Sequence, residues 1–246
     1  MLDQSLTSLE ISEGAWYGVP KNLVQEFEFL KNQDPVLAYA KLVDSPRSLT
    51  EKLIPFLKDI EQGFFIEAGA NNGFYQSNTL FLEKALGWTG ILVEPNTNAY
   101  KQCLNVRPKS TVINCALVDD PEIEFVTGYF TSEHPSQSLT GKIAEQKDSN
   151  DQNFNHRKRM PVPAATLTKI LESYKVENID FFSLDVEGYE LEALKGLDFE
   201  RWRPNLICVE SYKRENFFDL KKLLSLHGYI MLSQLTKRDF LFKSVK

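Results

Sequence analysis

The residues best suited to chemistry begin in the stretch Phe64-Phe-Ile-Glu-Ala-Gly-Ala-Asn-Asn-Gly73, where an apolar run ends in the acid Glu67. Gly69 and Gly73 predict a tight turn whose backbone approaches a ligand closely, since a Cβ there would collide with it. The spacing departs from the Gly-x-Gly-x-x-Gly pattern of dinucleotide-binding turns, because Asn71 replaces the second glycine. Glu67 would repel a pyrophosphate, so a nicotinamide-dependent oxidoreductase is the disfavoured alternative. The acid suits a cationic ligand.

A second acid, Glu94, follows the apolar run Ile91-Leu-Val93 and precedes Pro95. It lies about 25 residues beyond the first glycine, where the carboxylate of a nucleoside-binding fold accepts hydrogen bonds from both ribose hydroxyls. The two acids together predict recognition of a nucleoside without phosphate. That description fits S-adenosylmethionine better than NAD.

A third group of acids consists of Asp185, Glu187 and Glu210, which follow two further apolar runs. Carboxylates that converge on one crevice need protonation, hydrogen-bond donors, a cationic ligand or a metal ion. A divalent ion with oxygen ligands is possible, but the spacing identifies no metal ligands. Asp185 and Glu187 could also cap the helix that follows them, because acids favour helix N-termini.

The elements that must position these acids alternate along the chain from Gly63 onward. Apolar runs without polar alternation predict strands buried on both faces, and therefore a mainly parallel, doubly wound α/β sheet with helices on each side. After a helix that contains Phe217, Leu220 and Leu224, the chain is expected to end in an antiparallel hairpin. The expected strands are Phe64–Ile66, Ile91–Val93, Val112–Val118, Phe181–Leu184 and Leu206–Val209, and the expected helices are Thr79–Leu86, Asn98–Val106, Leu167–Tyr174 and Leu191–Leu194.

Two segments stand apart from this alternation. Residues 1–60 are predicted to form an N-terminal helical cap on a domain of residues 61–246, with a helix start at Asp34-Pro35 and a kink or split at Pro55. Residues 128–161 form a polar insertion, interpreted as a lid, which contains His134 and His156.

Composition excludes several classes of protein. With 28 basic and 34 acidic residues the chain carries a formal charge of −6, which disfavours a nucleic acid partner held by charge. No apolar run is long enough to span a membrane, and the polar N-terminus does not resemble a signal peptide. Three cysteines without a Cys-x-x-Cys pair fit a reducing compartment, so a cytoplasmic location is expected. The oligomeric state is left open.

Five short blocks, in this order, resemble the FkbM family of class I S-adenosylmethionine-dependent methyltransferases. They are Glu67-Ala-Gly-Ala-Asn-Asn-Gly73, Leu92-Val-Glu-Pro95, Asn114-Cys-Ala-Leu117, Pro163-Ala-Ala-Thr-Leu167 and Asp185-Val-Glu-Gly-Tyr-Glu190. The resemblance implies a seven-stranded Rossmann-like sheet with its last strand antiparallel. It also implies O-methylation of a hydroxyl on a sugar, glycan or natural product, with S-adenosylmethionine as cofactor.

The resemblance also implies roles for individual residues. Glu67 would hold the methionine amino group directly or through water, the loop from Gly69 to Gly73 would wrap the methionine moiety, and Glu94 would hold the ribose. Ala116 and Leu117 would flank the adenine, and Asp185 would lie near the methyl group. The expected cofactor-binding residues are Glu67, Ala68, Gly69, Asn71, Gly73, Ser77, Glu94, Pro95, Ala116, Leu117 and Asp185.

The catalytic base is not identified by the sequence. Asp185 and Glu187 are candidates by position, and His134 or His156 by chemistry, since imidazole titrates near neutral pH. The stretches Gly73–Thr79 and Trp88–Gly90 also resemble the Star-like branch of the superfamily, some members of which are trafficking proteins. A non-catalytic binding or trafficking module with the same fold is therefore the alternative function.

Overall fold

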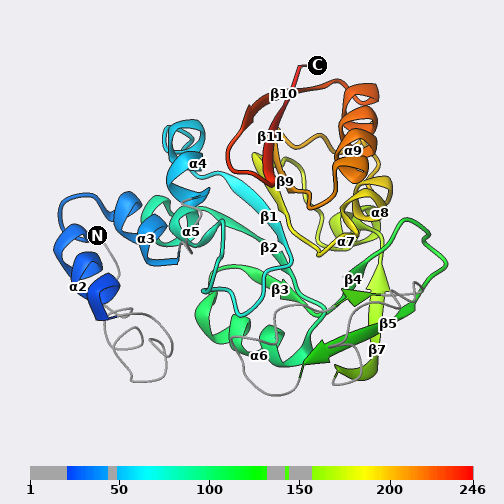
Figure 1. Cartoon of the computed structure of the whole chain (residues 1–246), viewed down its shortest axis with the longest axis horizontal. Helices are drawn as coiled ribbons and strands as arrows, with labels where there is room; N and C mark the ends of the chain where they lie inside the picture. The colour runs from blue at the N-terminus through cyan, green and yellow to red at the C-terminus, as the bar shows by residue number, and fades with distance from the viewer. Residues whose placement is uncertain (1–20, 44–48, 132–141, 144–156, 246) are drawn as a thin grey trace.

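A seven-stranded sheet forms the centre of the computed structural model, which describes residues 21–43, 49–131, 142–143 and 157–245 (Figure 1). Its strand order is β10-β11-β9-β8-β1-β2-β3, and only β11 runs against its two neighbours. This order confirms the predicted mainly parallel sheet with an antiparallel last strand. The strands are β1 Phe64–Ala68, β2 Thr89–Val93, β3 Thr111–Ile113, β8 Phe181–Leu184, β9 Leu206–Glu210, β10 Tyr229–Gln234 and β11 Asp239–Ser244.

Helices cover both faces of this sheet, on opposite sides in Figure 1. One apolar cluster joins the sheet to α7, α8 and α9, and the other joins it to α2, α3, α4, α5 and α6. Neighbouring residues of β1 divide between them, because Ile66 belongs to the first cluster and Phe65 to the second. The helices are α2 Lys21–Leu30, α3 Pro35–Val43, α4 Leu49–Leu57, α5 Leu80–Leu86, α6 Thr97–Val106, α7 Leu167–Ser173, α8 Glu190–Lys195 and α9 Arg214–Leu226.

Local signals fix several helix ends. Asp34 accepts a hydrogen bond from the Leu37 amide at 2.9 Å, which confirms the predicted start of α3. Helix α5 ends at Gly87, whose φ of 70° is the left-handed conformation that glycine adopts without a Cβ clash. The predicted split at Pro55 is wrong, because α4 continues without a break to Leu57 and buries Leu49, Leu53 and Leu57 on one face.

The described part of the predicted N-terminal cap packs directly on the sheet. Phe27 of α2 and Leu53 of α4 share an apolar cluster with Phe65 of β1. The division of the chain at residue 60 stays a prediction. Among the described residues, no helix is long and apolar enough to cross a membrane.

A smaller second sheet, of order β4-β7-β5-β6, follows β3 (Figure 1). The run Val112–Val118, predicted as one strand, divides between the two sheets at Asn114. Part of the predicted polar insertion lies in β5, β6 and β7, whereas residues 132–141 and 144–156, with His134 and His156, are outside the described residues. The interpretation of this insertion as a lid stays a prediction. The strands are β4 Ala116–Leu117, β5 Phe125–Thr131, β6 Lys142–Ile143 and β7 Arg157–Ala165.

The guanidinium of Arg107, at the end of α6, is completely buried between two carboxylates. It donates to Glu83 at 2.9 Å and to Glu67 at 3.4 Å. It also donates to the Ser77 hydroxyl at 3.1 Å and to the Thr79 hydroxyl at 2.9 Å. One side chain therefore ties together β1, α5, α6 and the loop that follows β1.

We predict that Arg107→Met lowers the free energy of unfolding by about 3–5 kcal/mol, because it leaves Glu67 and Glu83 buried without their counter-charge. Denaturant titration would measure the loss. The matched control is Arg201→Met, which removes an exposed ion pair with Glu172 and should cost about 1 kcal/mol or less. Equal losses in the two variants would contradict a structural role for the buried network.

Candidate functional site

A pocket lies at the carboxyl ends of β1, β2 and β8, where the small second sheet meets the large one. This is the position at which open α/β sheets bind ligands. Its lining combines carboxylates, aromatic rings and small apolar side chains. The lining residues are Gly69, Asn71, Tyr75, Gln76, Val93, Glu94, Pro95, Asn96, Ala99, Cys115, Ala116, Leu117, Phe130, Asp185, Val186, Glu187 and Tyr189.

The loop after β1 owes its glycines to chain packing. A Cβ on Gly69, which has a φ of 81°, would lie 1.7 Å from the Asp185 carbonyl oxygen. A Cβ on Gly73 would lie 2.7 Å from the Cys103 sulfur. Packing within the chain therefore already requires glycine at both positions, and the predicted close approach of a ligand to this loop stays a prediction. Asn71 has a φ of 53°, which asparagine tolerates.

Glu94 joins the loops that follow β1 and β2. Its two carboxylate oxygens accept hydrogen bonds from the backbone amides of Asn71 and Asn96, both at 2.7 Å. The side chain lines the pocket but is only 7% exposed. Burial raises the pKa of Glu94 to about 7, although the two amide donors act in the opposite direction. Its charge therefore changes near neutral pH.

Glu67 lies beneath the loop and does not line the pocket. Its Oε2 accepts hydrogen bonds from Ser77 at 2.9 Å and Thr79 at 2.6 Å, in addition to Arg107. Its Oε1 accepts from the Asn78 amide at 2.6 Å. The carboxylate thus organises the loop from within, and its predicted contact with a ligand amino group stays a prediction.

Small apolar side chains form one wall of the pocket. Ala116 and Leu117 of β4 are 2% and 3% exposed, and both line it together with Val93. Phe130 of β5 adds an aromatic ring from the second sheet. A flat, uncharged ring system is the kind of group that such a wall accommodates.

Asp185 lies directly after β8 and brings a carboxylate to the pocket. Among the described residues its Oδ1 is buried and has no hydrogen-bond partner. Burial first, and then the neighbouring carboxyl of Glu210, raise the pKa of Asp185 well above its ordinary value. Glu187 also lines the pocket and adds to this effect.

The predicted site residues divide into three groups. Those on the pocket lining are Gly69, Asn71, Glu94, Pro95, Ala116, Leu117, Asp185 and Glu187. Those packed behind it are Glu67, Ala68, Gly73 and Ser77. His134 lies outside the described residues.

Several lining residues were missed by sequence reasoning. Tyr75 lies in the stretch Gly73–Thr79 and Tyr189 in the block Asp185–Glu190, close in sequence to Asn71 and Glu187. Their positions in the sequence could therefore have predicted that both line the pocket. Phe130 carried no signal, because only strand pairing in the second sheet brings it to the pocket.

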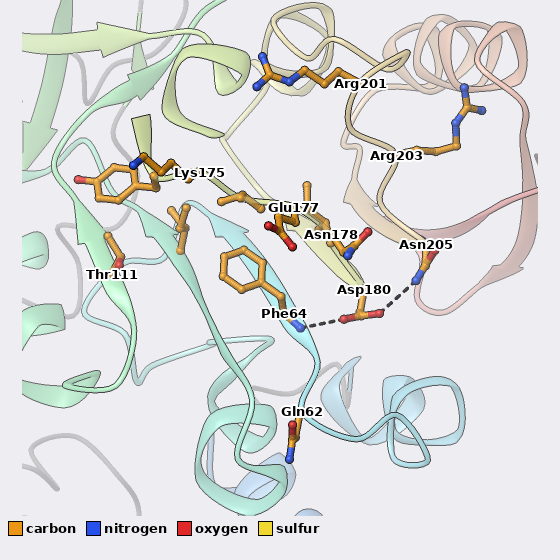
Figure 2. A pocket seen from close by; sticks show the side chains of 14 residues that line it. Gln62, Phe64, Thr111, Lys175, Glu177, Asn178, Asp180, Arg201, Arg203 and Asn205 are labelled. Atoms are coloured by element: carbon orange, nitrogen blue, oxygen red, sulfur yellow. Dashed lines mark hydrogen bonds between the residues drawn. The ribbon is translucent and has the colours of Figure 1, made fainter. Parts of the chain in front are cut away.

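A second hollow, of about 730 Å³, lies at the opposite edge of the sheet, where the strands begin (Figure 2). Several of its polar groups are used within the fold. The Asp180 carboxylate accepts hydrogen bonds from the Phe64 amide at 2.9 Å and from the Asn205 side chain at 3.1 Å. Arg203 donates to the His227 carbonyl at 2.7 Å. Although this hollow is larger, the unsatisfied oxygen of Asp185 lies in the pocket at the other edge.

The described side chains include no group of three or more histidine, cysteine, aspartate and glutamate residues arranged to hold a metal ion. The possible divalent ion therefore gains no ligand set from the described part of the chain. The three cysteines are buried and are not paired in disulfides.

The chain is similar in sequence to known methyltransferases. The chain is 26% identical over 179 residues to the methyltransferase sdnD of Sordaria araneosa, an alignment that covers 61% of this chain and 66% of that protein. The chain thus spans just under two thirds of the length of this curated relative.

Two solved structures show a similar chain path. One is an O-methyltransferase from Bacillus cereus in complex with SAH, with 11% identity, a TM-score of 0.46 and coverage of 99% of this chain and 96% of that chain. The other is precorrin-6y C5,15-methyltransferase from Geobacter metallireducens, with 8% identity and a TM-score of 0.45. That alignment covers 82% of this chain and 90% of the other chain.

Residues 67–235 match the family described as the methyltransferase FkbM domain. The match covers more than half of the chain and includes the loop after β1, the acids that follow β8 and the acid at the end of β9. The chain therefore belongs to the FkbM family of S-adenosylmethionine-dependent methyltransferases.

Proposed function

We propose that this protein transfers a methyl group from S-adenosylmethionine to a hydroxyl oxygen of a sugar, glycan or natural product. The observation that carries the proposal is the buried Oδ1 of Asp185, which lacks a hydrogen-bond partner among the described residues. A buried carboxylate oxygen without a donor is costly, so it is usually retained for a function. Here it borders the pocket at the carboxyl ends of the strands.

The pocket residues fit the parts of the cofactor. Glu94 would accept hydrogen bonds from the ribose hydroxyls, since each of its oxygens can accept a donor besides the backbone amide. Ala116, Leu117 and Phe130 would pack on the adenine. Asn71 and the loop around it would lie along the methionine moiety, with Glu67 reaching the amino group only through Oε1 or a bridging water.

The pocket must widen to admit a nucleoside. It encloses about 80 Å³, whereas pockets for ligands of this size hold hundreds of cubic ångströms. Tyr75, Gln76 and Tyr189 lie on its lining and come from loops outside the two sheets. Rotation of these side chains away from the pocket would open it without disturbing the strands.

The cofactor supplies a methyl carbon activated by a positively charged sulfonium. An alcohol is a poor nucleophile until its proton is removed, so the protein must supply a base. Its place on the lining, and an oxygen without a hydrogen-bond partner among the described residues, support Asp185 as this base. Glu187, also on the lining, is the second candidate, and the polar insertion with His134 would contribute to excluding water.

The alternative is a non-catalytic module of the Star-like type. The residues behind that resemblance mostly build the fold, since Trp88 is fully buried and donates to the Ile60 carbonyl at 3.0 Å. Calorimetric titration with S-adenosylhomocysteine, with NAD as control, tests the cofactor class. A screen of hydroxylated acceptors for S-adenosylhomocysteine formation then tests the reaction. Binding without turnover on any acceptor would favour the alternative.

The setting we propose is cytoplasmic, with a small-molecule or glycan acceptor. Three buried cysteines without a disulfide agree with a reducing compartment.

We predict that Asp185→Asn lowers kcat about 10²–10⁴-fold on a responsive acceptor, because the amide cannot accept the hydroxyl proton. Its affinity for S-adenosylhomocysteine should stay close to wild type, and calorimetry would check this. Glu177→Gln, the same type of change at the opposite edge of the sheet, is the matched control and should leave both values unchanged. If Asp185→Asn retains the full rate of turnover, Asp185 is not the catalytic base and another residue must accept the proton.

We predict that affinity for S-adenosylhomocysteine falls as the pH drops below about 7. Ribose hydroxyls donate to the ionised form of Glu94, so the ligand binds less tightly once this carboxyl is protonated, by up to about tenfold per pH unit. Above about pH 7 this contribution should be constant.

Glu94→Gln should flatten this pH profile and weaken binding above pH 7 by about 1–3 kcal/mol, through loss of charge-assisted hydrogen bonds. The exposed Glu122→Gln serves as control and should keep the wild-type profile. A pH dependence that persists in Glu94→Gln would exclude Glu94 as its source.

A further inference from the structure

Exposed cations from two separate segments meet at the edge of the large sheet where the pocket lies. Lys213 and Arg214 follow β9, and Lys237 and Arg238 precede β11. Because β11 runs antiparallel to β9, the start of one strand meets the end of the other. The Ser211 amide donates to the Arg238 carbonyl at 2.8 Å, which ties the two segments together. These four cationic residues form the basic patch.

Two exposed aromatic rings accompany the basic patch. The Arg238 guanidinium lies 4.0 Å from the centre of the Tyr212 ring, and the Arg214 guanidinium lies 5.7 Å from the centre of the Phe218 ring. Tyr212 and Phe218 are 46% and 55% exposed. Stacking on a ring restricts each guanidinium, so its planar fork of donors is held in place.

The cations of the basic patch form no ion pair with any described residue. The acids nearest in sequence, Glu215 and Asp219, are exposed on α9. Lys213 and Arg214 lie at the start of α9, where the helix dipole disfavours cations. Like charges are therefore held close together without a counter-ion from the described part of the chain, and a bound anion would relieve their repulsion.

Tyr212 connects the basic patch to the acids of the pocket. Strands β8 and β9 are parallel neighbours, so the residues that follow them share one edge of the sheet. After burial, the charges of Glu187, Glu210 and Asp185 raise the pKa of Tyr212, whereas Arg238 lowers it. Tyr212 thus lies within electrostatic reach of the basic patch and of two acids on the pocket lining.

Phosphate is the anion that these groups fit best. A guanidinium presents a planar fork that matches two phosphate oxygens, and an ammonium adds a compact charge. A single carboxylate cannot neutralise several cations, whereas a phosphate monoester carries about two negative charges near neutral pH. The exposed aromatic rings can pack on the organic part of such a ligand.

We propose that the basic patch binds the phosphate of a phosphorylated methyl acceptor, whose hydroxyl then points toward Asp185 in the pocket. The rings of Tyr212 and Phe218 pack on the organic part of the acceptor. This inference rests on the proposed function, because it places the acceptor beside the pocket assigned to the cofactor. The acceptor is then a phosphorylated alcohol, such as a sugar phosphate or a sugar carried on a diphosphate.

Binding of inorganic pyrophosphate to the whole chain tests the anion site. The protein is saturated with S-adenosylhomocysteine and then titrated calorimetrically at constant ionic strength. Pyrophosphate should bind saturably, and the dicarboxylate succinate should bind about tenfold more weakly because it carries less charge. The affinity for pyrophosphate should fall as the salt concentration rises.

Variants locate the bound anion. Arg238→Gln, and the double variant Lys213→Gln with Arg214→Gln, should each weaken pyrophosphate binding about tenfold or more through loss of charge-assisted hydrogen bonds. The matched control is Arg201→Gln, because Arg201 stacks 4.1 Å from the Trp202 ring but lines the hollow at the opposite edge of the sheet. This control should bind pyrophosphate as wild type does. Affinity for S-adenosylhomocysteine should be unchanged in all these variants.

Turnover connects the anion site to the reaction. For every acceptor that the screen identifies, the phosphorylated form should have a kcat/KM about tenfold or more above that of the form without phosphate. Arg238→Gln should remove this preference by raising KM, with little change in kcat. An acceptor that reacts equally well without its phosphate overturns the inference.

The outcomes separate this inference from the proposed function. If S-adenosylhomocysteine binds but pyrophosphate does not, the phosphate site is refuted and the proposed function stands. The same conclusion holds if Arg238→Gln and the double variant both bind pyrophosphate as wild type does. If these variants lose S-adenosylhomocysteine instead, the basic patch serves the cofactor and the inference is refuted. If wild type does not bind S-adenosylhomocysteine, the proposed function and the acceptor site fall together.

Discussion

The buried ion pairs of Arg107 are the interaction on which the shape of the site depends. This guanidinium holds Glu67 at the end of β1 and Glu83 in α5, and donates to the hydroxyls of the loop between them. Without a counter-charge, a carboxylate at the end of a fully buried strand would be too costly to keep ionised. With it, the loop is fixed so that the Asn71 amide meets Glu94. The shape of the pocket thus depends on buried ion pairs whose side chains do not line the pocket.

The two sides of the crevice differ in how their acids are satisfied. On the β1 and β2 side, Glu67 is neutralised by Arg107, and Glu94 receives two backbone amides. On the β8 and β9 side, Asp185 faces other carboxyls and keeps an oxygen for which the described part of the chain offers no donor. This unequal distribution leaves a carboxyl oxygen of Asp185 unsatisfied at a position where a cationic group would favour its ionised form. It agrees with a family whose cofactor carries a positive charge.

The second sheet contributes apolar side chains to the pocket lining. β4 leaves β3 at Asn114, whose side chain donates to the carbonyls of Glu94 and Pro95 at 2.8 and 3.1 Å. That turn places Ala116 and Leu117 on the lining of the same pocket as Asp185, and pairing of β5 with β7 adds Phe130. The apolar wall and the acidic edge therefore come from different sheets. Their separation gives the pocket one face for a flat ring and another for charge.

The sequence by itself determined the order of strands and helices in the large sheet, the antiparallel end of that sheet and the gathering of Glu94 and Asp185 at one end of it. Those features depend on local patterns, because continuous apolar runs need cover on both faces and parallel strands end at one edge. Only the tertiary structure decided that Glu67 pairs with Arg107, 40 residues away, and that the glycines of the loop make room for β8 and α6. It also decided that Glu210 adjoins Asp185 and that the run after β3 divides between two sheets. Such contacts depend on strand register and on packing between distant segments. Neither strand register nor packing between distant segments can be predicted from the spacing of residues along the chain.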